Sequence, residues 1–531
     1  MTNSSKSVRA GNTSLKSFWA LMPGFRLEYG GLVLASSALS ATEGILHPLL
    51  IKFIFDEVAL RHGAKRFMFL VLGYLALGLF LNLAGIFTAL WSKSLENRIV
   101  KAISGRMLRS YYDKEYASVL RQGHGYFITR IYGDLREGLL PMLSLVQSTI
   151  NQSALLLSLS LVLVYLSWEA FLFLAAIIPI SAAVGAQLGK KIKMLTSQER
   201  EREGSVLAIL DKALISFRIV RSFDLIPPVT RAFDHRLDGY LSASYNRYKT
   251  SRVYQTLNSL TMVVSDFLSM FVGALFVLKG ALTFGGYLAF VNSFWRAVTT
   301  LMQLFNRMAD FHAFGAITER IASFLSSSMA PYYREGPSVS VTNVAFSYAD
   351  TPVLRDFSFQ LTPKERVVIV GPNGCGKTTL ANILSGYMAP SEGEVILPER
   401  VSSVTLPIAF PPLRVRDLIP DPVLLSTLRL GGESVLEAFA DELSAGQQQK
   451  LALLLALSRE ADLYVIDEPL ANLDPESRQT AMNLIVEKTK DKNLILIMHG
   501  SEEFHKLFHR VIRIDLLSAA AGRQRETSVA V

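Results

Sequence analysis

Six long apolar stretches fill most of the first part of this chain and restrict what it can fold into. They occupy residues 30–55, 67–91, 139–166, 169–189, 255–279 and 283–307. A helix that crosses the hydrocarbon core of a bilayer needs about 20 mostly apolar residues, and each stretch is long enough. The sequence therefore predicts an α-helical six-span membrane domain, with the lipid bilayer as its surroundings.

The links between these stretches indicate how the domain is oriented. The links after the first, third and fifth stretches are short, whereas the other two are long, basic and patterned like helices. Lysine and arginine concentrate in cytoplasmic loops, so the long links and both termini are expected in the cytoplasm. The basic residues of the long links are Lys93, Arg98, Lys101, Arg106, Arg109, Lys114, Arg121, Arg130, Arg136, Lys190, Lys191, Lys193, Arg200 and Arg202. The net charge of +9 is thus typical of a multi-pass protein of the cytoplasmic (inner) membrane, and no nucleic-acid partner is expected.

The residues before the first apolar stretch are expected to form a helix on the inner membrane surface. Residues 1–25 contain no apolar core followed by a small-residue cleavage site. Their later part is amphipathic, which is typical of a helix lying on a membrane. The residues that give this pattern are Leu15, Phe18, Trp19, Leu21 and Met22. Before Leu15, a frayed terminus is an equal alternative.

The sequence pattern changes after the sixth apolar stretch. Residues 308–326 continue as a helical pattern, and a linker of small and turn-forming residues extends to about Ser338. Runs typical of strands then alternate with helical runs, which predicts a mainly parallel sheet with crossover helices. We therefore expect the membrane domain over residues 1–330 and a cytoplasmic α/β domain over residues 331–531.

A glycine-rich motif, Gly371–Thr378, follows an apolar strand run and precedes a helical run. It reads Gly-Pro-Asn-Gly-Cys-Gly-Lys-Thr, the pattern of a P-loop. Its glycines let backbone N–H groups wrap phosphates, Lys377 reaches the terminal phosphates, and Thr378 supplies a hydroxyl to Mg²⁺. The alternative, a glycine-rich turn without a ligand, does not explain the strand, loop and helix order. The motif predicts an ATPase domain with ATP and Mg²⁺ as cofactors.

Two acids, Asp467 and Glu468, end a strand run that begins at Leu463. Ligands bind at the carboxyl ends of the strands in α/β sheets. We expect Asp467 to hold the Mg²⁺ shell and Glu468 to polarise the attacking water. Two acids after a strand are commonplace on their own, and the P-loop in the same domain makes the assignment specific.

Further motifs resemble those of the ABC transporter superfamily. Leu443–Gln447 reads Leu-Ser-Ala-Gly-Gln and is similar to the family's signature sequence. Ala471–Asp474 resembles its D-loop, His499 its switch histidine, and Tyr348 the aromatic residue that stacks on adenine. The segment Pro48–Asp56 and the six-span layout before the ATPase domain resemble the family's exporter architecture, in its half-transporter form.

The resemblance implies that two ATPase domains face each other head to tail and share each ATP. Ser444 and the N-terminus of its helix would then contact the γ-phosphate in the partner copy. A homodimer is favoured because the motif residues are present, with a heterodimer as the alternative. Glu468 and His499 are the expected catalytic residues, and Thr378 and Asp467 the expected metal ligands. The expected nucleotide-binding residues are Tyr348, Gly371, Asn373, Gly374, Cys375, Gly376, Lys377, Thr378, Thr379, Ser444, Gly446, Gln447 and Asp474.

Departures from the family pattern and the direction of transport leave alternatives. Leu406 occupies the position of the family's Q-loop glutamine and cannot coordinate a metal. The short interval from Lys377 to Ser444 resembles the compact ATPase domains of cyclic-peptide and siderophore exporters. Cys375, the single cysteine, precludes an intrachain disulfide and is either reactive or shielded. An exporter is expected; an importer with the exporter fold, for example of a siderophore, and an ATP-gated regulatory or channel protein are the alternatives.

Polar residues recur along one face of the sixth apolar stretch. Positions 292, 296, 299, 303, 306 and 310 follow one another at steps of four and three. A charge deep in lipid costs about 2.5–3.5 kcal/mol, so such residues usually face a cavity or one another. We expect a cargo cavity for an amphipathic or peptide-like compound, lined by Glu43, His47, Asp266, Asn292, Arg296, Thr299 and Gln303. The alternative is that Arg296 pairs with Asp266 or Glu43 only to hold helices together.

Overall fold

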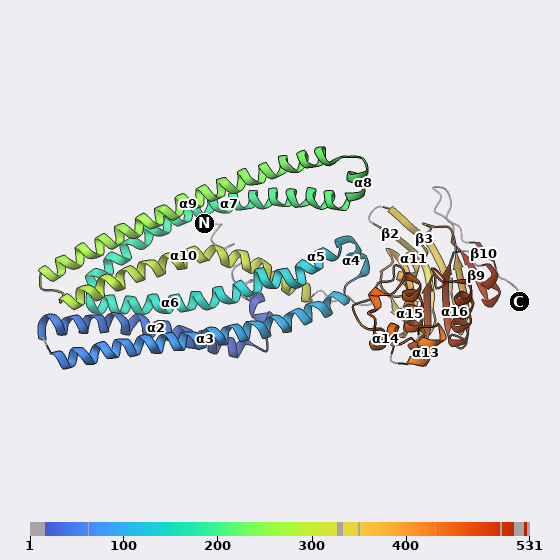
Figure 1. Cartoon of the computed structure of the whole chain (residues 1–531), viewed down its shortest axis with the longest axis horizontal. Helices are drawn as coiled ribbons and strands as arrows, with labels where there is room; N and C mark the ends of the chain where they lie inside the picture. The colour runs from blue at the N-terminus through green and yellow to red at the C-terminus, as the bar shows by residue number, and fades with distance from the viewer. Residues whose placement is uncertain are drawn as a thin grey trace. The chain divides into compact units, whose positions relative to one another are not determined.

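The computed structural model divides the chain into a helical unit and an α/β unit (Figure 1). It describes residues 16–61, 63–326, 333–348, 351–419, 421–430, 432–499, 502–514 and 525–527. The helical unit consists of Met1–Tyr111 and Tyr126–Ser327, and the α/β unit of Tyr112–Gly125 and Ser328–Val531. The segment Tyr112–Gly125 therefore belongs with the second half of the chain, although it lies within the first half of the sequence.

Six long helices coincide with the six predicted spans, and the predicted fold class is confirmed. They are α2 (Arg26–Asp56), α3 (Ala64–Tyr112), α6 (Leu140–Leu166), α7 (Trp168–Ile215), α9 (Ile226–Leu278) and α10 (Phe284–Ser326). Among the described residues, four helical segments are both long and apolar enough to cross a membrane: Arg26–Leu60, Ala64–Tyr112, His124–Leu166 and Ile226–Leu278. The helices α7 and α10 have 48 and 43 residues and are also long enough to span it.

Shorter elements connect these helices. They are η1 (Glu57–Arg61), α4 (Tyr116–Gln122), α5 (His124–Ile128), η2 (Thr129–Gly133), η3 (Leu135–Leu139) and α8 (Phe217–Ser222). The predicted N-terminal helix is present over residues 16–21, and Leu15 lies outside the described residues. Phe18, Leu21 and Met22 are buried, so one face of this helix packs against the rest of the unit.

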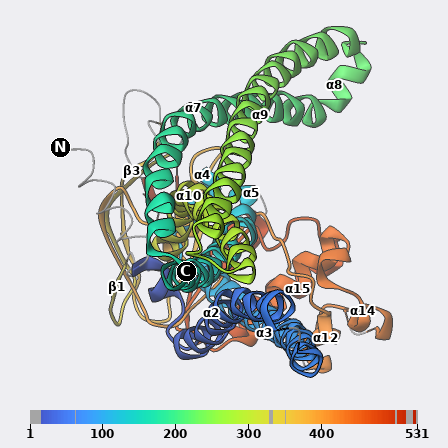
Figure 2. The same ribbon diagram turned by 90° about the vertical axis from the view of Figure 1, so that its left-hand side faces the viewer.

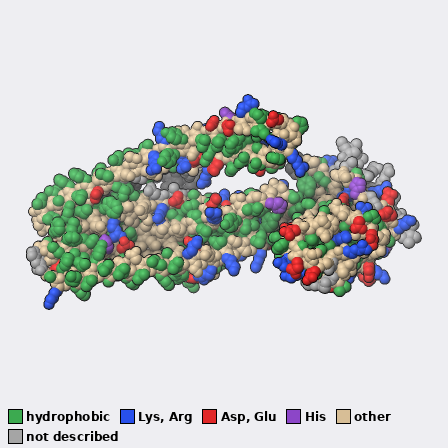
Figure 3. Space-filling view, viewed as in Figure 1, with side chains coloured by type: hydrophobic (Ala, Val, Ile, Leu, Met, Phe, Trp, Pro, Cys, Tyr) green, Lys and Arg blue, Asp and Glu red, His purple; other side chains and the backbone are tan. Residues whose placement is uncertain are grey.

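The helices of the helical unit pack in two groups (Figures 1 and 2). The helix α6 lies against both α2 and α10, while α7 and α9 run side by side. Leu159 and Leu163 of α6 form an apolar core with Phe290 and Phe294 of α10. Large apolar side chains cover much of the outer surface of the unit (Figure 3), which suits a lipid environment.

The α2–α10 contact depends on a capped helix start and on a close approach of two backbones. The carboxylate of Asp56 accepts hydrogen bonds from the amide of Gly285 (2.9 Å) and the hydroxyl of Thr283 (3.0 Å). A carboxylate at a helix N-terminus satisfies amides that have no partner within the helix. A Cβ atom on Gly285 would lie 2.1 Å from the main-chain oxygen of Lys52, so only glycine fits there.

The α/β unit contains two sheets. A four-stranded sheet has the order β1-β5-β2-β3, and a six-stranded sheet has the order β10-β9-β4-β8-β7-β6. The strands are β1 (Arg334–Glu335), β2 (Ser340–Tyr348), β3 (Thr351–Gln360), β4 (Arg366–Val370), β5 (Glu392–Leu397), β6 (Val401–Val404), β7 (Leu463–Asp467), β8 (Asn493–Met498), β9 (Arg510–Arg513) and β10 (Arg525–Thr527). In the larger sheet all neighbours except β10 and β9 are parallel, as the alternating pattern predicted.

Helices of this unit lie beside the parallel sheet and between its strands in sequence. They are α11 (Lys377–Leu384), α12 (Val415–Leu418), α13 (Pro422–Thr427), α14 (Glu433–Glu437), η4 (Ala440–Glu442), α15 (Ala445–Ser458), α16 (Pro475–Lys488) and η5 (Glu502–Leu507). Every residue of β7 is buried, so the strand that ends in Asp467 lies in the middle of the core. The short helices α12–α14 lie in the short interval between Lys377 and Ser444.

We expect Gly285→Ala to destabilise the helical unit, because the added methyl group meets backbone atoms that cannot rotate away. Overpacking of this kind costs about 1–3 kcal/mol. Thermal unfolding in detergent, followed by size-exclusion chromatography, should show a lower midpoint than wild type. Gly30→Ala is the matched control, since nothing lies within 4 Å of its added Cβ. Equal midpoints for both variants would contradict the close α2–α10 approach.

Candidate nucleotide site

The P-loop has the backbone geometry that the sequence predicted. It connects β4 to α11, and Gly374 and Gly376 have φ values of 84° and 96°. Residues with side chains rarely adopt such angles. A Cβ atom on Gly371 would lie 2.3 Å from the main-chain oxygen of Ile514, so the first glycine of the motif is needed for packing. Asn373 and Gly374 are exposed at the tip of the loop.

Lys377 and Thr378, the first two residues of α11, point their polar atoms into the site. Lys377 is 7% exposed, and its Nζ donates hydrogen bonds to the main-chain oxygens of Gly371 (2.8 Å) and Pro372 (2.9 Å). The ammonium group is therefore held within the loop, where the start of α11 also favours anions. The Thr378 hydroxyl donates to Oδ2 of Asp467 at 2.8 Å.

Asp467 is fully buried at the end of β7. Its second oxygen, Oδ1, has no hydrogen-bond partner among the described residues. Burial raises the pKa of this carboxyl, and the Thr378 hydroxyl acts in the opposite direction. A buried carboxylate oxygen without a protein partner, next to a threonine hydroxyl, is a donor set that fits Mg²⁺.

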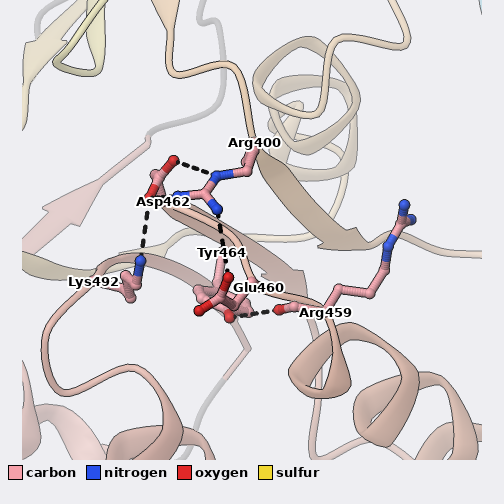
Figure 4. Close-up of polar contacts among 6 residues, drawn as sticks. All are labelled: Arg400, Arg459, Glu460, Asp462, Tyr464 and Lys492. Carbon is pink, nitrogen blue, oxygen red and sulfur yellow. Dashed lines mark hydrogen bonds and ion pairs between the residues drawn. The ribbon is translucent and has the colours of Figure 1, made fainter.

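A charged network fixes the other end of β7 (Figure 4). Arg400, just before β6, forms two 3.0 Å hydrogen bonds with Asp462, which also accepts one from Lys492 at 3.1 Å. The hydrogen bonds from Arg400 lower the pKa of Asp462. The Tyr464 hydroxyl donates to the main-chain oxygen of Arg459 at 2.8 Å. These contacts connect the starts of β6, β7 and β8.

Glu468 and His499 line a small pocket of about 120 Å³ next to Asp467. The pocket is also lined by the segment Pro469–Ala471, by Arg478 and by Met498. Glu468 has a φ of 49°, which turns the chain sharply after the strand, while its amide donates to the main-chain oxygen of Ile497 (2.8 Å). The Nε2 amide of Gln449 on α15 donates to the main-chain oxygen of Glu468 at 3.0 Å. Sequence reasoning missed Gln449, although it lies just after the signature motif.

The signature motif forms the N-terminus of α15. Ser444 caps the helix in a reciprocal arrangement with Gln447: the Gln447 amide donates to the Ser444 hydroxyl at 3.4 Å, and the Ser444 amide donates to Oε1 of Gln447 at 3.1 Å. Ser444 is nevertheless exposed. A Cβ atom on Gly446 would lie 2.8 Å from the main-chain oxygen of Asn472, so Gly446 lets the signature and D-loop segments touch.

Asp474 has a structural role within this chain. Its carboxylate caps α16 by accepting a hydrogen bond from the Ser477 amide at 2.9 Å. Hydrogen bonds from Ser477 lower the pKa of Asp474 to about 2. The sequence also predicts that Asp474 contacts nucleotide, and this helix cap does not test that prediction.

The remaining predicted nucleotide-binding residues lie around α11. The Tyr348 hydroxyl is 3.5 Å from the hydroxyl of Thr379, and the residue is 38% exposed. Cys375 is 3% exposed and belongs to an apolar cluster. Burial makes thiols inert, which supports the shielded alternative for Cys375.

Leu406 follows β6 and lies near Asp467. Its side chain cannot coordinate a metal, but its main-chain amide contributes to lowering the pKa of the Asp467 carboxyl. The backbone at this position therefore faces the Asp467 carboxylate. The peptide bond between Leu406 and Pro407 is cis.

The helix α4 belongs to the α/β unit and packs on the rest of that unit. The amide of Tyr116 donates to the main-chain oxygen of Tyr387 at 3.0 Å. Ala117 is 7% exposed and joins the apolar cluster that contains Leu380 and Met388. The cluster connects α4 to α11, the helix that begins with Lys377. Tyr387 carried no recognisable signal in the sequence.

The predicted cargo residues are paired with one another or with neighbours. Arg296 Nη2 lies 2.5 Å from Glu43 Oε1, and the Tyr74 hydroxyl lies 2.7 Å from Nε2 of His47. Gln303 accepts a hydrogen bond from Gln152 at 2.6 Å. Thr299 donates to the main-chain oxygen of Trp295, one turn earlier in its own helix.

Two further predicted cargo residues have unpaired groups. Oδ1 of Asn292 is buried without a partner in the described part of the chain. The structure shows no partner of the Asp266 carboxylate within the described ranges. Of the two acids proposed for Arg296, the structure therefore brings Glu43 to it and does not bring Asp266.

Known proteins match both halves of the chain. Residues 31–301 match the ABC transporter transmembrane region, and residues 354–414 match the ABC transporter family's ATPase region. An ATP-dependent lipid A-core flippase of Syntrophus aciditrophicus is 20% identical over 524 residues, which cover 90% of this chain and 85% of the relative. A protein of the same name from a Polaromonas species is 24% identical over 525 residues, covering 91% and 88%. The mitochondrial potassium channel ATP-binding subunit of Rattus norvegicus is 23% identical over 440 residues, covering 72% and 61%.

The transmembrane-region match alone covers just over half of the chain, and the P-loop, acid pair and signature lie together in the α/β unit as that family requires. The resemblance expected from the sequence is therefore confirmed. The chain belongs to the ABC transporter family and is an ATP-hydrolysing half-transporter of the exporter type.

Proposed function

We propose that two copies of this chain form an ATP-driven exporter of an amphipathic, lipid-like compound, working by alternating access. Each ATP would lie between the P-loop of one copy and Leu443–Gln447 of the other. The exposed Ser444 at the start of α15 supports this, because a helix N-terminus attracts phosphate. The presence of the catalytic and binding residues in one chain favours a homodimer, whereas Leu406 is the one departure that a heterodimer would explain.

The observation that carries the proposal is the hydrogen bond between Thr378 and Asp467, next to the unpartnered Oδ1 of Asp467. We assign these two side chains to Mg²⁺ and the Lys377 ammonium to the phosphates. Bound Mg²⁺ would neutralise negative charge on the phosphates during transfer. Lys377 would exchange its contacts with the loop carbonyls for phosphate oxygens, and the loop amides would donate to the remaining phosphate oxygens.

Glu468 and His499 are assigned to the hydrolytic step. Their shared pocket is large enough for a few water molecules, which supports the assignment. Glu468 would orient the attacking water and take up its proton, while His499 would donate a hydrogen bond to the γ-phosphate. Gln449, on α15, would hold the backbone of Glu468. A shift of α15 on contact with ATP would therefore change the position of Glu468.

Movement would reach the membrane helices through α4 and α8. The helix α4 packs against Tyr387 and the apolar cluster that contains Leu380 and Met388. The helix α8 exposes Phe217 (69%) and Ile219 (58%), which supports its coverage by the ATPase domain of a partner copy. We therefore assign α4 and α8 to coupling between the ATPase domains and the membrane helices of a dimer.

The nature of the cargo is inferred from two sources. Several relatives bear the name lipid A-core flippase, which favours a lipid-like cargo over the peptide-like cargo suggested by the polar stripe. The pairing of Arg296 with Glu43 leaves that stripe with less free charge than the sequence implied. A second candidate is an ATP-gated regulatory subunit, which the name of the rat relative favours.

Replacing Asp467 with asparagine tests the metal assignment without measuring turnover. Burial raises the pKa of Asp467, so its ionised form is less favourable in the ligand-free fold than in the unfolded chain. We expect Asp467→Asn to raise the unfolding temperature in the absence of ligands and to lose the stabilisation by Mg²⁺ with a non-hydrolysable ATP analogue. Asp462→Asn at the other end of β7 is the control and should keep that stabilisation. An unchanged Mg²⁺ response in Asp467→Asn would contradict the assignment.

Glu468→Gln tests the hydrolytic role. The amide keeps the shape of the side chain but cannot take up a proton, so ATP should bind and close the dimer while turnover falls by about 10²-fold or more. Phosphate release and radiolabelled ATP retained after gel filtration measure the two effects. Glu442→Gln, an exposed acid just before the signature, should behave like wild type. A wild-type hydrolysis rate in Glu468→Gln would rule out its assignment.

Arg296→Ala tests whether the polar stripe contacts cargo. If it does, basal ATPase activity should persist while stimulation by lipid A and export fall. The competing explanation is that Arg296 only stabilises Glu43, since removing one member of an ion pair within a membrane-spanning segment leaves the other charge uncompensated. In that case expression and basal ATPase activity should fall and should recover in Arg296→Ala with Glu43→Gln. Such a recovery would remove Arg296 from the cargo site.

A further inference from the structure

A buried carboxylate in the helical unit joins the segments at which the chain passes between the two units. Asp134 lies between the π-helical segments η2 and η3 and is 5% exposed. Its Oδ2 accepts a hydrogen bond from Arg130 at 3.0 Å, and its Oδ1 accepts one from Arg320 at 2.8 Å. Arg130 is four residues away on the same segment, whereas Arg320 lies on α10. Only the Arg320 contact connects separate elements.

The Asp134–Arg320 contact lies near two of the points at which the chain passes between the two units. The chain leaves the helical unit after Tyr111, returns at Tyr126, and leaves again after Ser327. Asp134 follows the return point closely, and Arg320 precedes the final exit. An ion pair between them therefore connects two of the three segments that link the helical unit to the α/β unit. Movement of one unit can reach the other only through these links or through a direct contact.

Aromatic and hydrogen-bond contacts bring the third segment into the same joint. The rings of Tyr111 and Phe127 are 4.9 Å apart, and those of Phe127 and Phe324 are 6.3 Å apart. The Ser110 hydroxyl donates to the main-chain oxygen of Phe324 at 3.1 Å. The end of α3, the end of α5 and the end of α10 thus meet at one place, which we name the crossing joint.

The backbone of η3 also lies directly against α10. A Cβ atom on Gly138 would lie 2.1 Å from Cγ2 of Ile317, so a side chain there would force the two elements apart. Short π-helical segments often mark functional positions, because they place an extra residue in a helix at a cost in hydrogen-bond geometry. Here the π-helical segments place Asp134 towards Arg320 and Gly138 towards Ile317.

We propose that Asp134 is a positioning residue for energy coupling: its contact with Arg320 makes the crossing joint move as one body, so that closure of the ATPase domains reaches the outer ends of the membrane helices. This inference rests on the proposed function. Without the carboxylate, ATP should still bind and be hydrolysed, but the segment around Asp134 should follow the movement of α10 less closely. Asp134 touches neither the P-loop nor the acid pair.

The test compares ATP turnover with movement at the outer end of the membrane domain. Lys65→Cys, exposed at the outer start of α3, carries a spin label, and the distance between the labels of two copies is measured with and without ATP and vanadate. The buried Cys375 should stay unlabelled, which the chain without Lys65→Cys verifies. Asp134→Asn should keep kcat and KM for ATP within about twofold while the nucleotide-dependent distance change falls at least about fivefold.

Companion variants separate coupling from simple stabilisation. Arg320→Gln should reproduce the Asp134→Asn effect, and the double variant should add little to it. Arg130→Gln should have a smaller effect because its contact is local. Asp134→Glu should restore part of the movement, and Glu137→Gln, an exposed acid on the same segment, should match wild type.

Two results would overturn the proposal. One is an unchanged distance shift in Asp134→Asn. The other is a parallel loss of ATPase activity, thermal stability and movement that Asp134→Glu does not relieve, because that would indicate a purely structural role. A wild-type protein that hydrolyses ATP but shows no shift at position 65 would instead contradict alternating access itself, and with it the proposed function.

Discussion

The proposed mechanism depends on one hydrogen bond in the ATPase domain, which the Thr378 hydroxyl donates to the Asp467 carboxylate. It connects the first turn of α11 to the end of the central strand β7. One oxygen of the buried carboxylate accepts this bond, and the other has no hydrogen-bond partner among the described residues. A buried ionised carboxylate costs free energy in the folded protein, and a cation bound there, as we propose, would offset that cost.

The helical unit also places charged groups in apolar surroundings, which we expect to be lipid. Two ion pairs lie within or near its apolar stretches: Arg296 with Glu43, and Asp134 with Arg320. Pairing lowers the cost of keeping charge away from water. Each pair also joins α10 to another element of the helical unit.

Local motifs could be predicted from the sequence, whereas long-range partners could not. The P-loop and the acid pair were recognisable because each carries its chemistry within a few consecutive residues. The spans were recognisable because their length reflects the thickness of a bilayer. By contrast, Asp134 and Arg320 are separated by 186 positions, and each looked like one more charge in a polar link. Glu43 and Asp266 were equal candidates for Arg296, and Gly285 showed no sign of the backbone it touches.

The central claim is that hydrolysis at the Lys377–Asp467 site drives net movement of an amphipathic lipid out of the cytoplasm. Its most direct test measures ATP hydrolysis and transport together in inside-out membrane vesicles, with fluorescent lipid A as the probe. The account predicts ATP-dependent accumulation of the probe against its gradient, in proportion to the ATP hydrolysed and abolished by vanadate. Hydrolysis accompanied only by movement down the gradient, or by movement in the opposite direction, would contradict it.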